Sequence, residues 1–166
     1  MIKNNICILT SLMGFMVSAL LSSCNNKEEV NFKNEPTITQ GIYGQVLERY
    51  GDWMPVADGP EDNSRGYRPL IRDVYVYAYT NYQEFDSIYC CYYPADKMPN
   101  PLVAKTTSNK DGFYQISLEP GTYSFFVLEE GRMYANFGDG YGGLAPITII
   151  ADSARQVNLV IDHGVD

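Results

Sequence analysis

The stretch TTSNKDGFYQISLEPGTY, residues 106–123, determines how this chain folds. A strand ending in Thr107 is followed by Asn109-Lys110-Asp111-Gly112, and Asp-Gly between alternating apolar runs is a strong turn signal. The chain then returns with alternate residues on one face of a strand, and Pro120-Gly121 makes a second tight turn. The stretch therefore predicts successive antiparallel strands that share one apolar face. On that face we expect Tyr114, Ile116, Leu118, Tyr123, Phe125 and Val127.

Short alternating runs separated by turn residues continue on both sides, and no helical period occurs after residue 40. Seven or eight such strands within residues 40–162 are typical of an antiparallel β-sandwich, with Val74, Val76, Val157 and Leu159 completing its core. The expected strands are Ile42–Glu48, Asp73–Thr80, Ser87–Tyr93, Leu102–Thr107, Phe113–Leu118, Thr122–Glu129, Ile147–Ile150 and Gln156–Ile161.

Two stretches rich in glycine or proline, Tyr50–Pro69 and Asn136–Gly143, do not fit as strands. We expect both to be long loops, and irregular loops on a rigid sandwich are where binding residues usually lie.

The first twenty-four residues indicate export. Lys3 precedes an apolar run, Ile6–Leu21, which ends in Leu21-Ser22-Ser23-Cys24. This pattern resembles a bacterial lipoprotein signal, in which Cys24 would become the first residue of the mature chain and carry the acyl chains. The alternatives are a transmembrane helix, for which the run is short, and ordinary secretion. We expect a signal peptide at 1–23, a flexible tether at 24–39 and a lipid-anchored protein of the outer membrane.

Lys27, Glu28 and Glu29 follow closely after Cys24. A basic residue and two acidic ones at this place resemble the surface-export signal of Bacteroidetes lipoproteins, which implies display on the cell surface. The alternatives are a solvated tether and a domain on the periplasmic face.

Charge excludes one class of partner. The chain has 12 basic and 20 acidic residues, a net charge of −8, and loss of the signal with Lys3 makes it one unit more negative. We expect no nucleic-acid binding, and membrane attachment through the lipid alone.

Catalytic and metal-ligating patterns are sparse. The single histidine, His163, falls in the tail 163–166, which we expect to fray, so a histidine-based triad has little to stand on. Asp58, Glu61, Asp62 and Asp139 lie in the two loops and could bind Ca²⁺, but their spacing favours a solvated acidic surface. We therefore expect no enzyme activity, no metal and no cofactor.

Cys90 and Cys91 are the two cysteines left after Cys7 and Cys24. Adjacent side chains on a strand point to opposite faces, which disfavours a bond between them. We expect one packed in the core and one outside it, rather than a redox pair.

Tyrosine occurs 14 times. Tyr75, Tyr77 and Tyr79 alternate with Val74 and Val76, so one face of that strand should be core and the other a tyrosine ladder. The ladder either packs against Tyr89, Tyr92 or Tyr93 under the loops or forms an exposed platform for sugar rings and proteins.

Residues 40–162 resemble the carboxypeptidase regulatory-like domain, a transthyretin-like β-sandwich. The resemblance rests on residues 106–123, on the opening strand Gly41–Val46, on Asp73–Val76 and on the closing strands Ile147–Ile150 and Val157–Ile161. The resemblance implies the fold and carries little information about activity; metallocarboxypeptidases with this domain keep their zinc site in a separate catalytic domain, which is absent here. Tyr50–Pro69 and Tyr82–Pro101 look longer than the family pattern.

These observations lead to one expected function and one alternative. The first is an envelope lipoprotein that presents a β-sandwich for adhesion, scaffolding or assembly with another surface protein. The alternative is a glycan-binding module of a surface polysaccharide-utilisation system, and a hydrolase comes third. The candidate ligand contacts are Trp53, Tyr75, Tyr77, Tyr79 and Tyr141.

Overall fold

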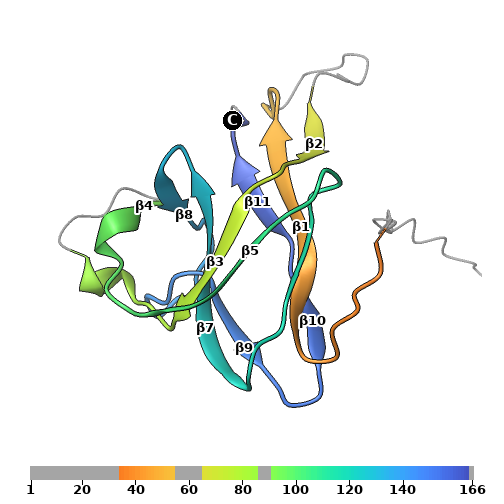
Figure 1. The fold of residues 1–166 in the computed structure, drawn as a ribbon. Coiled ribbons are helices and arrows are strands. Elements are labelled where there is room, and N and C mark those ends of the chain that lie inside the picture. The colour runs from red at the N-terminus through yellow and green to blue at the C-terminus, as the bar shows by residue number, and fades with distance from the viewer. Residues whose placement is uncertain (1–33, 55–64, 86–90, 165–166) are drawn as a thin grey trace, which may run out of the picture. The chain divides into compact units, whose positions relative to one another are not determined.

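A computed structural model describes residues 34–54, 65–85 and 91–164, and the account below concerns these residues. They form two β-sheets packed as a sandwich, with two short 3₁₀ helices beside them (Figure 1). The predicted all-β sandwich is confirmed.

The first sheet is built around one long strand, β1 (Gly41–Tyr50). The first half of β1 pairs with antiparallel β6 (Phe113–Ile116) and with parallel β10 (Ala154–Gln156). Its second half pairs with antiparallel β2 (Gly66–Pro69) and with parallel β11 (Leu159–Asp162). The sheet is therefore mixed.

Between β10 and β11 the backbone comes very close to β1. A Cβ on Gly44 would lie 1.8 Å from the carbonyl oxygen of Val157, so only glycine fits there. The backbone N–H of Gln45 donates to Oδ1 of Asn158 (3.1 Å), which replaces a ladder bond between main chains. The expected strand Gln156–Ile161 is interrupted at this point and forms two strands.

The second sheet is centred on β7, whose first half pairs with β9 and whose second half pairs with β8. Strand β3 lies on its other side, followed by β5 at one edge, and β4 extends the sheet beyond β8. The strands are β3 (Asp73–Ala78), β4 (Tyr92–Pro94), β5 (Leu102–Thr107), β7 (Gly121–Glu129), β8 (Arg132–Tyr134) and β9 (Pro146–Ile149).

Two strands lie where none was expected. Together with the division of the expected strand Gln156–Ile161 into two, they bring the described strands to eleven. β2 falls inside the expected loop Tyr50–Pro69. It was not predicted because the glycine and proline at its ends are typical of loops, although an edge strand tolerates proline. β8 follows the turn at Glu130-Gly131 and is too short for its alternation to be recognised.

Eight of the ten residues predicted for the core are buried between the sheets; Tyr123 and Val157 are only partly buried. Tyr114 keeps its hydroxyl satisfied by donating to the carbonyl of Val157 (2.7 Å), and burial raises the pKa of Tyr114. The eight are Val74, Val76, Tyr114, Ile116, Leu118, Phe125, Val127 and Leu159.

The opposite face of the second sheet is also buried, under an aromatic layer. Tyr77 and Tyr93 both pack edge-on against Phe126, with ring centroids 5.8 and 5.9 Å away. Phe85 lies 5.1 Å from Tyr93. Because Phe126 follows Phe125 in β7, the sheet has apolar side chains on both faces.

The chain before β1 is attached to the first sheet. The backbone N–H of Thr37 donates to Oε1 of Gln115 (2.9 Å), and Nε2 of Gln115 donates to the Thr37 hydroxyl (2.8 Å). Gln40 donates to the carbonyl of Leu118 (2.8 Å). Residues 1–33, with the proposed signal and lipidation site, lie outside the described part.

Candidate functional site

A cavity of about 510 Å³ opens beside the glycine-rich loop, and Tyr82, Cys91 and Tyr93 form its other side. Its walls are aromatic rings, small side chains and bare glycine backbone. We name it the loop pocket. The residues that line it are Tyr82, Cys91, Tyr93, Ala135, Asn136, Phe137, Gly138, Gly140, Gly142, Gly143 and Leu144.

The carboxylate of Asp139 holds the glycine-rich loop from inside. Its Oδ1 accepts the backbone N–H groups of Tyr141 (2.8 Å) and Gly143 (2.9 Å), and its Oδ2 accepts the hydroxyl of Tyr79 (3.0 Å). These donors, the Tyr141 N–H first, lower the pKa of Asp139, while the carboxylate raises the pKa of Tyr79. The loop is therefore fastened to the end of β3.

Asn81 provides a second attachment. Its side chain donates to the carbonyl of Tyr141 (3.3 Å), and the next residue, Tyr82, donates its N–H to the carbonyl of Gly142 (2.9 Å). Gly142 has φ 99°, and a Cβ there would lie 2.8 Å from the Asn81 side chain. Glycine is thus required where the two segments meet, and the loop has one defined shape.

Four aromatic side chains near this pocket are exposed: Tyr79 and Tyr82 by almost two-fifths, Phe137 by 41%, and Tyr141 by 88%. Tyr82 and Phe137 line the cavity, and Tyr141 lies in the loop itself. Exposed aromatic side chains beside a cavity with apolar walls are characteristic of a binding site.

The tyrosine ladder does not form an exposed platform. Tyr77 is 7% exposed beneath the aromatic layer, and Tyr75 is half-buried with its ring stacked on Tyr77 (6.4 Å). Lys105 lies 4.7 Å above the Tyr75 ring. Of the three ladder residues only Tyr79 reaches the pocket region, because the rings of Phe126 and Tyr93 cover this face of the sheet.

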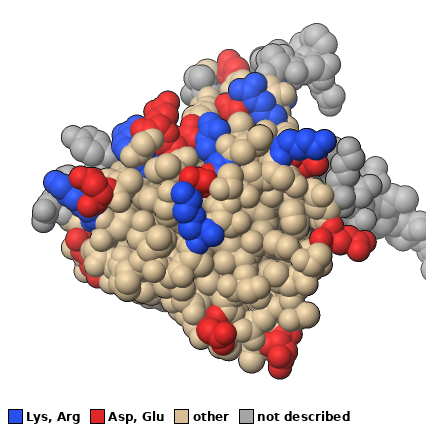
Figure 2. Space-filling model, in the orientation of Figure 1, with Lys and Arg blue, Asp and Glu red and all other residues tan. Residues whose placement is uncertain are grey.

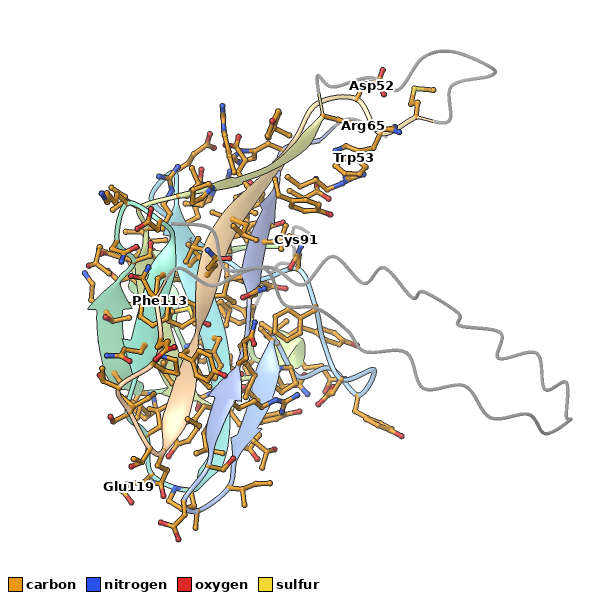
Figure 3. All side chains as sticks on the ribbon, turned by 90° about the vertical axis from the view of Figure 1, so that its right-hand side faces the viewer. Asp52, Trp53, Arg65, Cys91, Phe113 and Glu119 are labelled. Atoms are coloured by element: carbon orange, nitrogen blue, oxygen red, sulfur yellow. The ribbon has the colours of Figure 1, made fainter. Side chains whose placement is uncertain are left out.

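Trp53 lies away from the loop pocket, beside Arg65 at the end of β1 (Figure 3). The guanidinium carbons of Arg49 and Arg65 lie 4.6 and 5.4 Å from the Trp53 ring, and Tyr67 packs against it at 5.6 Å. Its indole N–H donates to the carbonyl of Tyr50 (3.0 Å). Trp53 is therefore packed on the sandwich, and the candidate contacts do not form one site.

The ends of β1 and β7 carry a cluster of ionisable side chains, which we name the charged end. Nδ1 of His163 lies 3.0 Å from Oε1 of Glu48, and its Nε2 lies 3.5 Å from Oε1 of Glu129. Arg68 pairs with Glu48 and Arg72 pairs with Glu129, and both glutamates are buried. Figure 2 shows charged side chains of both signs gathered mainly in the upper part of this face.

This cluster joins the two sheets, because Glu48 lies in β1 and Glu129 lies in β7. Arg68 holds the pKa of Glu48 below its ordinary value against the opposing effect of burial, and His163 adds to the lowering. His163 is thus not in a frayed tail. The sequence did not reveal this because both partners are over thirty residues away along the chain.

The described residues contain no group of three or more histidine, cysteine or acidic side chains able to hold a metal ion. The loop acids Asp58, Glu61 and Asp62 lie outside the described part, and Asp139 is occupied in holding its own loop. Cys90 is likewise outside it, whereas Cys91 is half-buried in the wall of the loop pocket.

Sequence reasoning identified Tyr141 and its loop but missed the other aromatic residues of the pocket. Phe137 lies between Asn136 and Gly138, an apolar ring within a polar and glycine-rich stretch. That contrast is the signal by which the sequence could have identified it. Tyr82 and Tyr93 also line the pocket, but they lie more than forty residues from the glycine-rich loop along the chain, so no local pattern connects them to it.

Comparisons with known proteins give no match: no family model, no curated protein and no solved structure resembles this chain significantly. Within the described ranges, none of the helices has the length and apolar character needed to cross a membrane.

Proposed function

We propose that this chain is a non-catalytic, lipid-anchored envelope module of the carboxypeptidase regulatory-like type, and that it recognises another envelope protein through the loop pocket. The observation that carries the proposal is the combination of a preformed cavity with four exposed aromatic side chains beside it. Exposed apolar surface of this kind costs solubility, and a partner that covers it accounts for its presence.

The rigidity of the loop favours recognition of a protein. Asp139 and Asn81 hold the loop by hydrogen bonds before any ligand arrives. Binding then costs little conformational entropy, which is the advantage of a preorganised site. Exposed tyrosine rings supply large contact areas with few rotatable bonds, and they are enriched where proteins meet.

A glycan is the second candidate, supported by the flat rings of Phe137 and Tyr141. Sugar recognition also needs polar side chains directed at the hydroxyl groups. The polar side chains nearest the loop, Asp139 and Asn81, use most of their hydrogen-bonding positions within the protein. The pocket wall is largely apolar, so we place the protein partner first.

The test is an affinity isolation from envelopes of the same cells with the purified chain in neutral detergent, beside a glycan array. We expect one partner in stoichiometric amount, with recovery falling at least threefold for Tyr141→Ala and unchanged for the matched control Tyr67→Ala. Tyr67 is 55% exposed on β2, in the other sheet. A glycan signal lost in Tyr141→Ala would replace the protein partner with the second candidate, and hydrolysis of any substrate would refute the non-catalytic role.

The proposed anchor is supported by the sequence alone, since Cys24 lies outside the described residues. Each methylene of an acyl chain that is buried in the membrane contributes about 0.8 kcal/mol, and one chain alone binds only marginally. Two or more acyl chains therefore give stable attachment. Cys24→Ala should move the protein from the membrane fraction to the soluble fraction. An unchanged membrane share would contradict lipidation.

Surface display is a separate part of the proposal, and it depends on Lys27, Glu28 and Glu29. Protease added to intact cells should digest the parent protein but spare a variant in which these three residues are replaced by alanine. Complete protection of the parent would place the domain on the periplasmic face.

A further inference from the structure

The segments that supply the lining of the loop pocket contain acidic residues next to the lining positions and no basic residue. Residues 80–85, 91–95 and 135–145 form that lining and its immediate neighbours, and they contain Glu84 and Asp139 but no lysine or arginine. The next turn, η2 (Ala95–Lys97), adds Asp96 beside Lys97 and leaves the balance unchanged. Among the ion pairs found in the described ranges, neither Glu84 nor Asp139 takes part.

Neutral donors hold both carboxylates in place. Oε2 of Glu84 accepts the Asn81 N–H (2.7 Å), and the Asn100 amide donates to both of its oxygens at 3.1 and 3.0 Å. Asp139 accepts two backbone N–H groups and the Tyr79 hydroxyl. A carboxylate without its proton has about four acceptor positions, and three contacts are made to each of these two, so each has one further position open to a donor.

Aromatic rings and uncompensated carboxylates together favour a cation. The faces of Tyr and Phe rings attract cationic groups, and a guanidinium also stacks on them because it is planar and weakly hydrated. The apolar wall suits the aliphatic stem of a long basic side chain, whose charged head stays near the rim. An anionic ligand would meet repulsion from Glu84, from Asp139 and from a chain of net charge −8.

We propose that the loop pocket receives an arginine side chain from a basic segment of the partner protein. This inference rests on the proposed function and specifies the partner's chemistry: an arginine whose stem lies against Phe137 and Tyr82, and whose guanidinium lies near Tyr141 and the two carboxylates. Lysine follows as a weaker occupant because its ammonium is more strongly hydrated.

The test uses the purified chain in neutral detergent and short, end-capped alanine peptides whose central residue is arginine, lysine, citrulline, norleucine or glutamate. Amide NMR signals of the glycine-rich loop report binding. At about 0.01 M salt we expect arginine to bind at least fivefold more tightly than citrulline, and glutamate to bind weakest. The preference should shrink at about 1 M salt, where the screening length is about 3 Å.

Two variants assign the preference to the pocket. Tyr141→Ala should lower the affinity for the arginine peptide by about two- to fivefold, as loss of an exposed cation–π contact does. Tyr67→Ala should leave its affinity unchanged. Both side chains are more than half exposed, so both variants should fold.

Equal affinity for arginine and norleucine would overturn the inference and leave an apolar docking pocket, in which case the proposed function stands. Absence of loop signal changes with every peptide would also overturn it. If the affinity isolation recovers no envelope partner while the arginine peptide still binds, the proposed function is contradicted and the arginine site stands.

Discussion

The charged end and the loop pocket treat carboxylates in opposite ways. At the charged end Glu48 and Glu129 are buried and each meets an arginine, with His163 between them. At the loop pocket Glu84 and Asp139 are exposed and are held only by neutral donors. The first arrangement neutralises charge within the protein, and the second leaves it directed outward.

This difference indicates which region stabilises the fold and which region is available to a partner. A buried ion pair whose partner is removed leaves a costly uncompensated charge, so such clusters tolerate little change. An exposed aromatic side chain contributes little to folding and can change without loss of the fold. Four sets of substitutions test this division, beginning with the one expected to change stability most.

The largest effect is expected for Phe126→Ala, which removes the ring that supports the pocket from beneath. Phe126 is fully buried and contacts Tyr77 and Tyr93, so the free energy of unfolding should fall by about 3–5 kcal/mol. The same substitution at Phe137, which is 41% exposed in the pocket wall, should cost less, about 1–2 kcal/mol. Denaturant unfolding measures both, and equal costs would show that the pocket wall is part of the core.

Glu129→Gln should lower the free energy of unfolding by about 3 kcal/mol, because it leaves Arg72 without its buried partner. The effect lies at the low end of the usual range since Arg72 is one-third exposed. The control is Glu130→Gln at the next position, where an exposed carboxylate lies 3.7 Å from Arg132. It should change stability by less than about 0.5 kcal/mol. A small effect at both positions would contradict the role given to the charged end.

Acid should weaken the charged end selectively. Because the folded pKa of Glu48 is lowered, its contribution is present above the ordinary glutamate value of 4.5 and is lost as pH falls through the lower folded value. The parent should therefore lose its stability advantage over Glu48→Gln on acidification below pH 4.5. Unfolding curves from neutral to strongly acidic pH measure this difference. An advantage that grew in acid would reverse the sign of the argument.

The smallest effect on stability is expected for Tyr141→Ala, at less than about 0.5 kcal/mol. The ring is 88% exposed, and the loop is held through the backbone of residue 141 rather than its side chain. Thermal unfolding of the parent and of the variant should give midpoints within about 2 °C. A larger drop would show that the ring packs on the sandwich and is not available to a partner.

Much of the sandwich follows from local sequence. The alternation of Val74 with Tyr75 and the turns at Asp111-Gly112 and Pro120-Gly121 place β3, β6 and β7 where they were expected. What local sequence could not supply is pairing between distant segments. β2 was hidden by its terminal glycine and proline, and the parallel pairing of β10 and β11 with β1 depends on the close contact at Gly44.

The candidate site was predictable only in part. The glycine-rich loop and Tyr141 were identified from composition, and both lie at the pocket region. Trp53 was chosen as a lone tryptophan in an expected loop, but the arginines that enclose it come from β1 and from residue 65. For the tyrosine ladder the sequence left packing under the loops and an exposed platform both open, and Tyr77 proves to be packed, 7% exposed with Phe126 edge-on against it.

The most direct test of the central claim is hydrogen exchange of the full chain with and without its envelope partner. If the partner binds at the loop pocket, the backbone amides of residues 135–144 and 80–85 should exchange more slowly when it is present. Exchange around Tyr67 and the charged end should be unchanged. Protection confined to β2 and to the residues around Trp53, with the glycine-rich loop unaffected, would contradict the claim that the loop pocket is the recognition site.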